Sequence, residues 1–212
     1  MMSKAPDKTI DFSHADIYYG CSEKRLKPST KILEWLVLNL KDLINGNESV
    51  IPRNYGVSKM SPSYDKRRNF FNDDINTFNE ALKLVQKSNL PKSGWYIFEG
   101  YTAPDIYIET KEYIIVGEAK RTENHLTTST MWLQVRDQLI RHIDAVIDSG
   151  KEVLSFFIFD RKVFNKNYEN KMCNYDKFEY YRKSLPHRDD QTIQRVLNTF
   201  IGYTFWDDVA KK

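Results

Sequence analysis

Two acidic residues and a lysine have the chemical types needed to act together on a phosphodiester bond. Asp105 follows Pro104, and the triplet Glu118-Ala119-Lys120 ends the next apolar stretch of the chain. Two carboxylates offer the hard oxygen atoms that Mg²⁺ prefers, and a lysine ammonium can stabilise the charge that develops on phosphorus. If the three side chains meet, they suit metal-assisted hydrolysis of phosphodiesters.

A β-hairpin is the element that would bring these residues together. Isoleucine alternates with other residues over 106–109, as in a half-buried strand, and 113–116 is an apolar run typical of a strand covered on both faces. The polar residues 109–112 predict a tight turn between the two. Because alternate residues of a strand point the same way, Glu118 and Lys120 are expected on one face, with the Pro-Asp pair opening the other strand.

The context of the triplet separates it from similar patterns elsewhere in the chain. An acidic residue two positions before a lysine also occurs at 109–111, 160–162 and 169–171. The first of these falls in the expected turn and the third in a loop rich in asparagine and lysine. Only the triplet at 118–120 ends an apolar strand after a Pro-Asp pair, and solvated charges at a strand end are the structural alternative to a site.

Together with the order of the surrounding elements, these residues resemble the PD-(D/E)XK nuclease superfamily, which has the restriction-endonuclease-like fold. The resemblance covers residues 73–160 and implies an α/β protein with a central mixed sheet of about four or five strands flanked by helices. It assigns 95–101 as the first strand, the hairpin as the second and third, 131–147 as a helix and 153–159 as a parallel last strand.

The resemblance also assigns roles to residues. Asp105 and Glu118 would bind Mg²⁺, for which Mn²⁺ can substitute, the backbone carbonyl of Ala119 would be a third ligand, and Lys120 would be the catalytic amine. Many members carry a further acidic ligand on the first helix. Glu34 is expected to fill that place, because its neighbours in sequence are apolar and a competing residue, Glu80, lies opposite an apolar stripe.

The expected helix over 131–147 supplies auxiliary residues. Its apolar side chains fall on one arc that would pack on the sheet: Trp132, Val135, Leu139, Ile143 and Val146. Arg136 lies inside this arc, where it would pair either with an active-site carboxylate or phosphate or with a structural acid. Gln134 and Gln138 share the polar face. Some members have a Gln and a Tyr four apart here, whereas this chain has Gln138 and His142, and His142 is not expected to bind Mg²⁺.

Length and composition indicate one packed domain spanning 1–212. The chain has 212 residues, of which 41% are hydrophobic and 14% aromatic, enough for a full core. The expected core, 73–160, lies between a helical extension with a long loop, 1–72, and a second helical extension, 161–212. The tail from Asp189 predicts a terminal helix that caps the core or forms a dimer surface.

Several features indicate a cytoplasmic protein that is not embedded in a membrane. No apolar run is long enough to span a bilayer, and the N-terminus lacks a signal-peptide core. The two cysteines, Cys21 and Cys173, have no metal-ligand spacing and are expected to be free thiols.

Basic residues near aromatic ones suggest where a nucleic acid would be contacted. The net charge of +3 is too small to argue for binding by itself. The expected loop 45–69 holds the candidate contacts to nucleic acid, which are Arg53, Lys59, Lys66, Arg67 and Arg68. A solvated basic face is the alternative.

The sequence therefore predicts a Mg²⁺-dependent nuclease that cuts DNA, as an endonuclease of restriction, defence or repair type. Two alternatives remain open: a catalytically inactive nucleic-acid-binding or interaction module with the same fold, and a nuclease that cleaves RNA or branched junctions. Action as a homodimer and action beside a partner subunit both fit the sequence.

Overall fold

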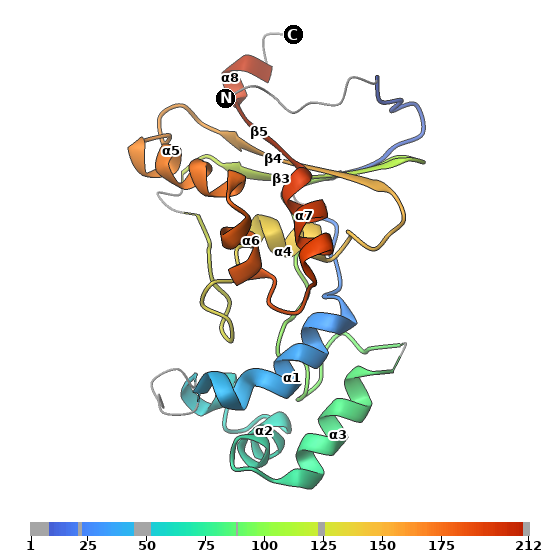
Figure 1. Cartoon of the computed structure of the whole chain (residues 1–212), viewed down its shortest axis with the longest axis vertical. Coiled ribbons are helices and arrows are strands. Elements are labelled where there is room, and N and C mark those ends of the chain that lie inside the picture. Colours follow the sequence, from blue (N-terminus) through green and yellow to red (C-terminus); the bar gives the residue numbers. More distant parts are fainter. Residues whose placement is uncertain (1–8, 21–22, 45–51, 88, 123–125, 210–212) are drawn as a thin grey trace. The chain divides into compact units, whose positions relative to one another are not determined.

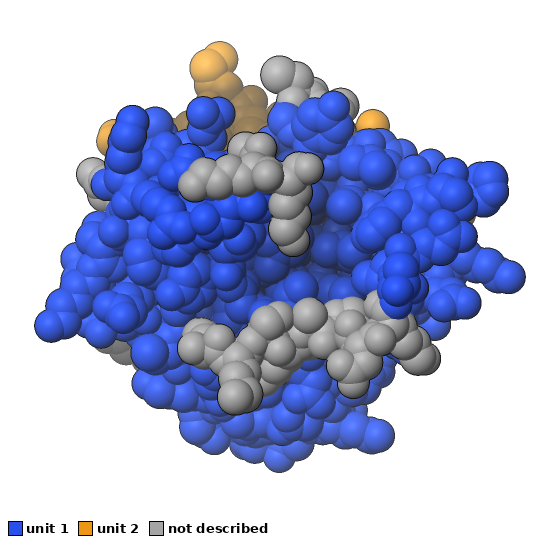
Figure 2. Space-filling model, turned by 90° about the horizontal axis from the view of Figure 1, so that it is seen from above, with its two compact units in different colours: residues 1–26, 102–128, 135–212 blue, residues 27–101, 129–134 orange. Residues whose placement is uncertain are grey.

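The computed structural model describes residues 9–20, 23–44, 52–87, 89–122 and 126–209. The chain forms two compact units, which Figure 2 distinguishes by colour. Unit 1 consists of 1–26, 102–128 and 135–212, and unit 2 consists of 27–101 and 129–134. The core expected from sequence, 73–160, therefore takes residues from both units.

Unit 1 is built on an open mixed sheet of five strands in the order β1-β2-β3-β4-β5 (Figure 1). The strands are β1 Asp16–Tyr19, β2 Ile106–Glu109, β3 Tyr113–Lys120, β4 Glu152–Phe159 and β5 Phe200–Phe205. β1, β2 and β3 pair antiparallel, and β4 and β5 continue the sheet in parallel with β3. The expected α/β class, the hairpin and the parallel strand over 153–159 are confirmed.

The first strand of the sheet is not the expected one. Residues 95–101 form no strand, and β1 occupies the place beside β2, with Tyr19 opposite Ile106. The prediction was wrong because Tyr96 and Phe98 are buried in a hydrophobic cluster of unit 2. In addition, the carbonyls of this segment that a strand would use accept hydrogen bonds from Arg67.

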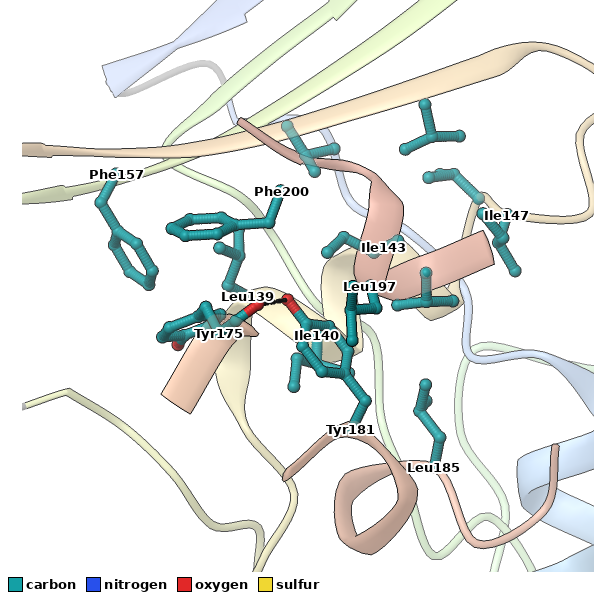
Figure 3. Packing of buried hydrophobic residues seen from close by; sticks show 14 of the residues in the cluster. Leu139, Ile140, Ile143, Ile147, Phe157, Tyr175, Tyr181, Leu185, Leu197 and Phe200 are labelled. Carbon is teal, nitrogen blue, oxygen red and sulfur yellow. Dashed lines mark hydrogen bonds between the residues drawn. The ribbon is translucent and has the colours of Figure 1, made fainter. Parts of the chain in front are cut away.

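Helices cover one face of the unit 1 sheet. These are α4 Gln138–Asp144, α5 Lys166–Met172, α6 Phe178–Ser184 and α7 Asp190–Asn198, with a 3₁₀ turn η4 at Cys173–Asp176, and a short helix α8, Trp206–Val209, directly follows β5. In Figure 1, α4, α6 and α7 lie on the same side of β3, β4 and β5. Figure 3 shows Phe157 and Phe200 of the sheet packed toward Leu139 of α4 and Tyr175, all of them buried.

The helix α4 is much shorter than the expected helix over 131–147. It begins at Gln138 because the Asp137 carboxylate caps it, accepting a hydrogen bond from the backbone N of Ile140 at 3.0 Å. The residues before it turn at Thr130, and Trp132 packs against Phe71 within unit 2. The apolar spacing that predicted one long helix therefore comes from two segments that pack in different units.

The C-terminal tail also differs from the expected helix through Phe200. α7 ends at Asn198, and the following residues form β5, which pairs with β4. Phe200 packs on Tyr175, with ring centroids 4.8 Å apart. A run of aromatic and β-branched residues around Gly202 favours a strand, and this preference outweighs the helical spacing that reaches Phe200.

Unit 2 is helical in its described part and overlaps the expected extension 1–72 only from Lys27 on. It contains α1 Thr30–Ile44, a 3₁₀ turn η3 at Arg53–Gly56, α2 Ser63–Phe71 and α3 Ile75–Val85. Its core joins α1, α2 and α3 through buried residues such as Leu36, Phe70 and Ala81. The expected loop 45–69 is shorter in the structure, because α2 begins at Ser63; residues 45–51 lie outside the described residues.

None of the described helices is long and apolar enough to cross a membrane. Of the two cysteines, Cys173 is an exposed free thiol, and Cys21 lies outside the described part of the chain.

Candidate active site

The hairpin of β2 and β3 brings Asp105 next to the Glu-Ala-Lys triplet. Ile106 pairs with Gly117, so Asp105, one residue before β2, comes level with Glu118. The backbone N of Ala119 donates a hydrogen bond to Asp105 Oδ2 at 2.8 Å. This bond ties the start of one strand to the end of the other and places Asp105 close enough to Glu118 for its charge to act on Asp105.

Glu118 and Lys120 point to the face of the sheet that the helices cover. They alternate with Ala119 and follow Val116, a core residue on the same face. Glu118 is 1% exposed and Lys120 6%, and Lys120 Nζ lies 3.3 Å from Glu118 Oε2. A buried carboxylate and ammonium at this distance compensate each other's charge.

Two side chains of α4 reach Glu118 from the other side. His142 Nε2 lies 2.5 Å from Glu118 Oε1, and Gln138 Nε2 donates to the same oxygen at 3.1 Å. The second oxygen, Oε2, is buried and has no hydrogen-bond partner among the described residues. Its contact with Lys120 is an ion pair without hydrogen-bond geometry, so one oxygen of Glu118 is fully engaged and the other is not.

The surroundings of Asp105 raise the pKa of its carboxyl group. Burial raises the pKa of Asp105, and the nearby charge of Glu118 raises it further. The hydrogen bond from Ala119 and the charge of Lys120 act in the opposite direction but do not cancel the rise. Two adjacent carboxylates of this kind are the setting in which a bound divalent cation is most favourable.

The donor set fits a hard cation that keeps part of its water shell. Within the described ranges, no group of three or more His, Cys, Asp or Glu side chains is arranged to hold a metal ion. Mg²⁺ does not need such a group, because it is commonly bound through one or two carboxylates and several waters. The unsatisfied Oε2 of Glu118 and the carboxylate of Asp105 meet that requirement.

A narrow hollow next to the site has Glu118, Lys120, Asp137 and Tyr175 among its lining residues. Asp137 is fully buried, and burial raises its pKa, opposed by its hydrogen bonds. The hydroxyls of Tyr175 and Tyr180 both donate to Asp137 Oδ2 at 2.8 Å, while its Oδ1 caps α4. Both oxygens are therefore engaged, and Asp137 holds α4 in place.

The sequence did not single out Asp137 or the role of His142. An aspartate directly before a helical apolar pattern is a recognised helix-start signal, and it would have placed the start of α4 correctly. The spacing of Gln138 and His142, four residues apart, puts both side chains on one face of α4. Their shared target, Glu118 Oε1, follows only from the packing of α4 on β3.

The auxiliary residues fall in different places. Arg136 is 1% exposed and pairs with Asp144, with Nη2 at 2.7 Å from Asp144 Oδ2, and it also donates to the carbonyl of Ser184 at 2.9 Å. Asp144 is a structural acid of the kind expected as one of its two partners. Gln138 contacts Glu118, whereas Gln134 is exposed and belongs to unit 2.

The expected acidic ligand of the first helix lies in unit 2. Glu34 accepts a hydrogen bond from Gln86 Nε2 at 2.7 Å, and its competitor Glu80 pairs with Lys66. Each carboxylate thus has a partner within its own unit.

The basic residues expected to contact nucleic acid divide into exposed and buried ones. Arg53 and Lys59 are exposed, and Arg68 is exposed and pairs with Asp65. Arg67 is 7% exposed, and its guanidinium donates to backbone carbonyls of Tyr55, Trp95 and Ile97. Arg67 therefore has a clear structural role in unit 2.

Comparisons of the chain with protein-family models, with curated proteins and with solved structures gave no match.

Proposed function

We propose that unit 1 is a metal-dependent nuclease that hydrolyses phosphodiester bonds in DNA, as an endonuclease of restriction, defence or repair type. The observation that carries the proposal is the meeting of Asp105, Glu118 and Lys120 at the end of the β2–β3 hairpin, with Glu118 Oε2 buried and unsatisfied beside the lysine. A buried carboxylate oxygen without a hydrogen bond is costly unless a ligand completes it.

The topology around the hairpin supports membership of the PD-(D/E)XK superfamily. Three antiparallel strands are followed by α4, which lies over the sheet, and by the parallel strand β4. From β2 onward this is the element order that the superfamily resemblance implies, whereas α1, α2 and α3 stand between β1 and β2, where the resemblance implies no helix. Fold alone does not define function, so the proposal depends on the three side chains.

Asp105 and Glu118 would hold Mg²⁺, with the Ala119 carbonyl as a proposed third ligand. When bound, the ion supplies polarisation of the scissile phosphate and a more acidic water. The ammonium of Lys120 orients the attacking water and stabilises the charge that develops on the phosphoryl oxygens. Because Lys120 and Glu118 are buried, this electrostatic effect is stronger than it would be in open solvent.

A binding or interaction module without catalysis is the second candidate. It would share the fold and contact nucleic acid through exposed basic residues of unit 2 such as Arg53, Lys59 and Arg68. Paired carboxylates beside a polyanion count against it, because they repel phosphate unless a cation is present. Cleavage of RNA or branched junctions would use the same chemistry on another substrate shape.

Cleavage assays test the proposal directly. The purified chain is incubated with single-stranded, duplex and branched DNA and with RNA, in Mg²⁺ or in chelator, beside Lys120→Ala and Asp105→Ala variants. Each variant should lose at least about 100-fold in cleavage rate, the usual effect of removing one group that stabilises the transition state. Lys111→Ala, an exposed lysine in the turn of the same hairpin, is the matched control and should retain activity.

Cleavage at the wild-type rate by Lys120→Ala, or cleavage that persists in chelator, would contradict the proposal. Binding of DNA without cleavage, and without Mg²⁺ binding that depends on Glu118, would favour the second candidate.

A further inference from the structure

Glu118 is held by α4 through one of its two oxygens only. His142 Nε2, at 2.5 Å, and Gln138 Nε2, at 3.1 Å, both contact Oε1. A carboxylate oxygen accepts about two hydrogen bonds, so these contacts fill Oε1. The other oxygen, Oε2, faces Lys120 and has no hydrogen bond within the described structure.

His142 is itself fixed on its far side. Its ring is fully buried, and Nδ1 lies 2.7 Å from Thr102 Oγ1. Thr102 is held in turn by two backbone hydrogen bonds with Leu26, of 2.7 and 2.9 Å. Because an ionised carboxylate can only accept, Nε2 carries the hydrogen toward Glu118, and Thr102 contacts the other nitrogen. Thr102, His142 and Glu118 thus form a chain of contacts in which the ring cannot rotate freely.

A second buried histidine of unit 1 contacts a carboxylate that is paired differently. His187 Nε2 contacts Asp144 at 3.0 Å, and Asp144 also receives bonds from Arg136 and Arg188, so that both of its oxygens are engaged. Glu118 differs, because its donors gather on one oxygen. An arrangement built only for stability would be expected to satisfy the second oxygen as well.

We propose that His142, supported by Gln138, is a positioning residue that makes Glu118 a one-oxygen ligand and directs Oε2 toward the cation. The inference rests on the proposed function. Hydrogen bonds to ligating groups orient them, and loss of such a partner typically weakens metal binding by about 10–100-fold. His142 therefore acts on the cation through Glu118 and not as a ligand itself.

The test is Mg²⁺ binding by calorimetry, using the full chain without nucleic acid. His142→Leu fills the buried space with an apolar side chain but removes the hydrogen-bond donor to Glu118. It should raise the Kd for Mg²⁺ by about 10–100-fold. His142→Gln returns an amide donor near the place of Nε2 and should recover much of this loss. His187→Leu removes the other buried histidine and should leave the Kd unchanged. Thermal unfolding of every variant in chelator reports the structural cost separately.

The outcomes distinguish this inference from the function on which it rests. If Glu118→Gln abolishes Mg²⁺ binding but His142→Leu binds as tightly as wild type, the positioning role is overturned and the nuclease proposal stands. Equal weakening by His142→Leu and His187→Leu would also overturn it, because that result reports general destabilisation. If the wild type shows no Mg²⁺ binding that depends on Glu118, both proposals fall together.

Discussion

Three buried carboxylates of unit 1 differ in how completely their oxygens are paired. Asp144 is surrounded by two arginines and a histidine, and Asp137 accepts from two tyrosines and caps a helix. Glu118 is equally buried but leaves Oε2 without a hydrogen bond. At the scale of single residues, incomplete pairing and not burial distinguishes Glu118 from the other two, and the proposed role of Glu118 as a ligand rests on this difference.

The charge of Asp105 is expected to reduce the stability of the cation-free protein. Its pKa is raised, so the folded state favours the protonated acid. A group of this kind contributes stability below its unfolded pKa, and that contribution is lost as pH rises through the folded pKa. Asp105→Asn, which keeps an acceptor for the Ala119 N–H, should therefore raise the melting temperature in chelator at pH 7.

The same substitution should remove the stabilisation that added Mg²⁺ gives to the wild type. Melting curves in chelator and in Mg²⁺, recorded from pH 4 to pH 8, measure both effects. The advantage of Asp105→Asn in chelator should grow as pH increases. A melting temperature below that of the wild type at pH 7 would contradict the expected effect of the raised pKa.

The residue types of the site could be predicted from sequence, but most of their partners could not. Asp105, Glu118 and Lys120 stood out because a proline and an apolar strand define their context. His142 and Thr102 carry no comparable signal, since their contacts with Glu118 and with each other join residues far apart in the chain. Arg136 was recognisable as a buried charge, although Asp144 was not identifiable as its partner.

At the scale of elements, the position of Gln138 and His142 depends on a very short helix. α4 has seven residues, fewer than the roughly 12–15 that an isolated helix needs for stability in water. Its N-terminus is held by Asp137, whose other oxygen accepts from Tyr175 and Tyr180. The Asp137 carboxylate thus links the start of α4 to Tyr175 and Tyr180.

Asp137→Ala should lower the free energy of unfolding by about 2–4 kcal/mol, because it removes a helix cap and leaves two tyrosine hydroxyls without their acceptor. Asp189→Ala removes the corresponding cap of α7, where the carboxylate belongs to an exposed residue and accepts from Thr192 N at 2.7 Å. That variant should cost only about 1 kcal/mol. Urea denaturation measures both values. Equal losses of stability in the two variants would argue against the link between α4 and the two tyrosines.

Strong local apolar patterns predicted some elements correctly and gave wrong predictions for others. The β2–β3 hairpin and β4 have apolar runs bounded by clear turns, and they form where expected. Residues 95–101 and 131–137 have equally apolar patterns, but they bury only some of their side chains, among them Phe98 and Trp132, and do so without forming the predicted strand or helix. A periodic pattern reports that a face is buried, and it does not say which neighbour covers that face.

At the scale of the whole chain, the order of elements makes the sheet difficult to predict from the sequence. Its first two strands are separated by 27–101, the larger segment of unit 2. β1 has only four residues, too few to stand out from sequence, and its partner β2 follows the helices α1, α2 and α3 of unit 2. The long separation explains why the sequence predicts the first strand close to the hairpin and gives no signal for β1.

Asp144 connects three segments of unit 1, because its carboxylate contacts Arg136 before α4, and His187 and Arg188 between α6 and α7. Asp144→Asn would remove the buried negative charge that Arg136 and Arg188 share and should lower the free energy of unfolding by about 3–5 kcal/mol at pH 7. Asp148 also pairs with Arg188, but its side chain is 48% exposed. Asp148→Asn is therefore the control and should cost about 1 kcal/mol or less.

The stability that Asp144→Asn loses should depend on pH, because it comes from the charge of the Asp144 carboxylate. Burial alone would raise the pKa of Asp144, but Arg136, His187 and Arg188 hold it far below its ordinary range. The ionised form is thus favoured by folding, and its contribution is complete above the unfolded pKa of about 3.9 and declines as pH falls toward the folded pKa. Urea denaturation at several pH values should show the difference between wild type and Asp144→Asn shrinking below about pH 4. A difference that stays constant into stronger acid would show that the stability comes from packing around Asp144 and not from its charge.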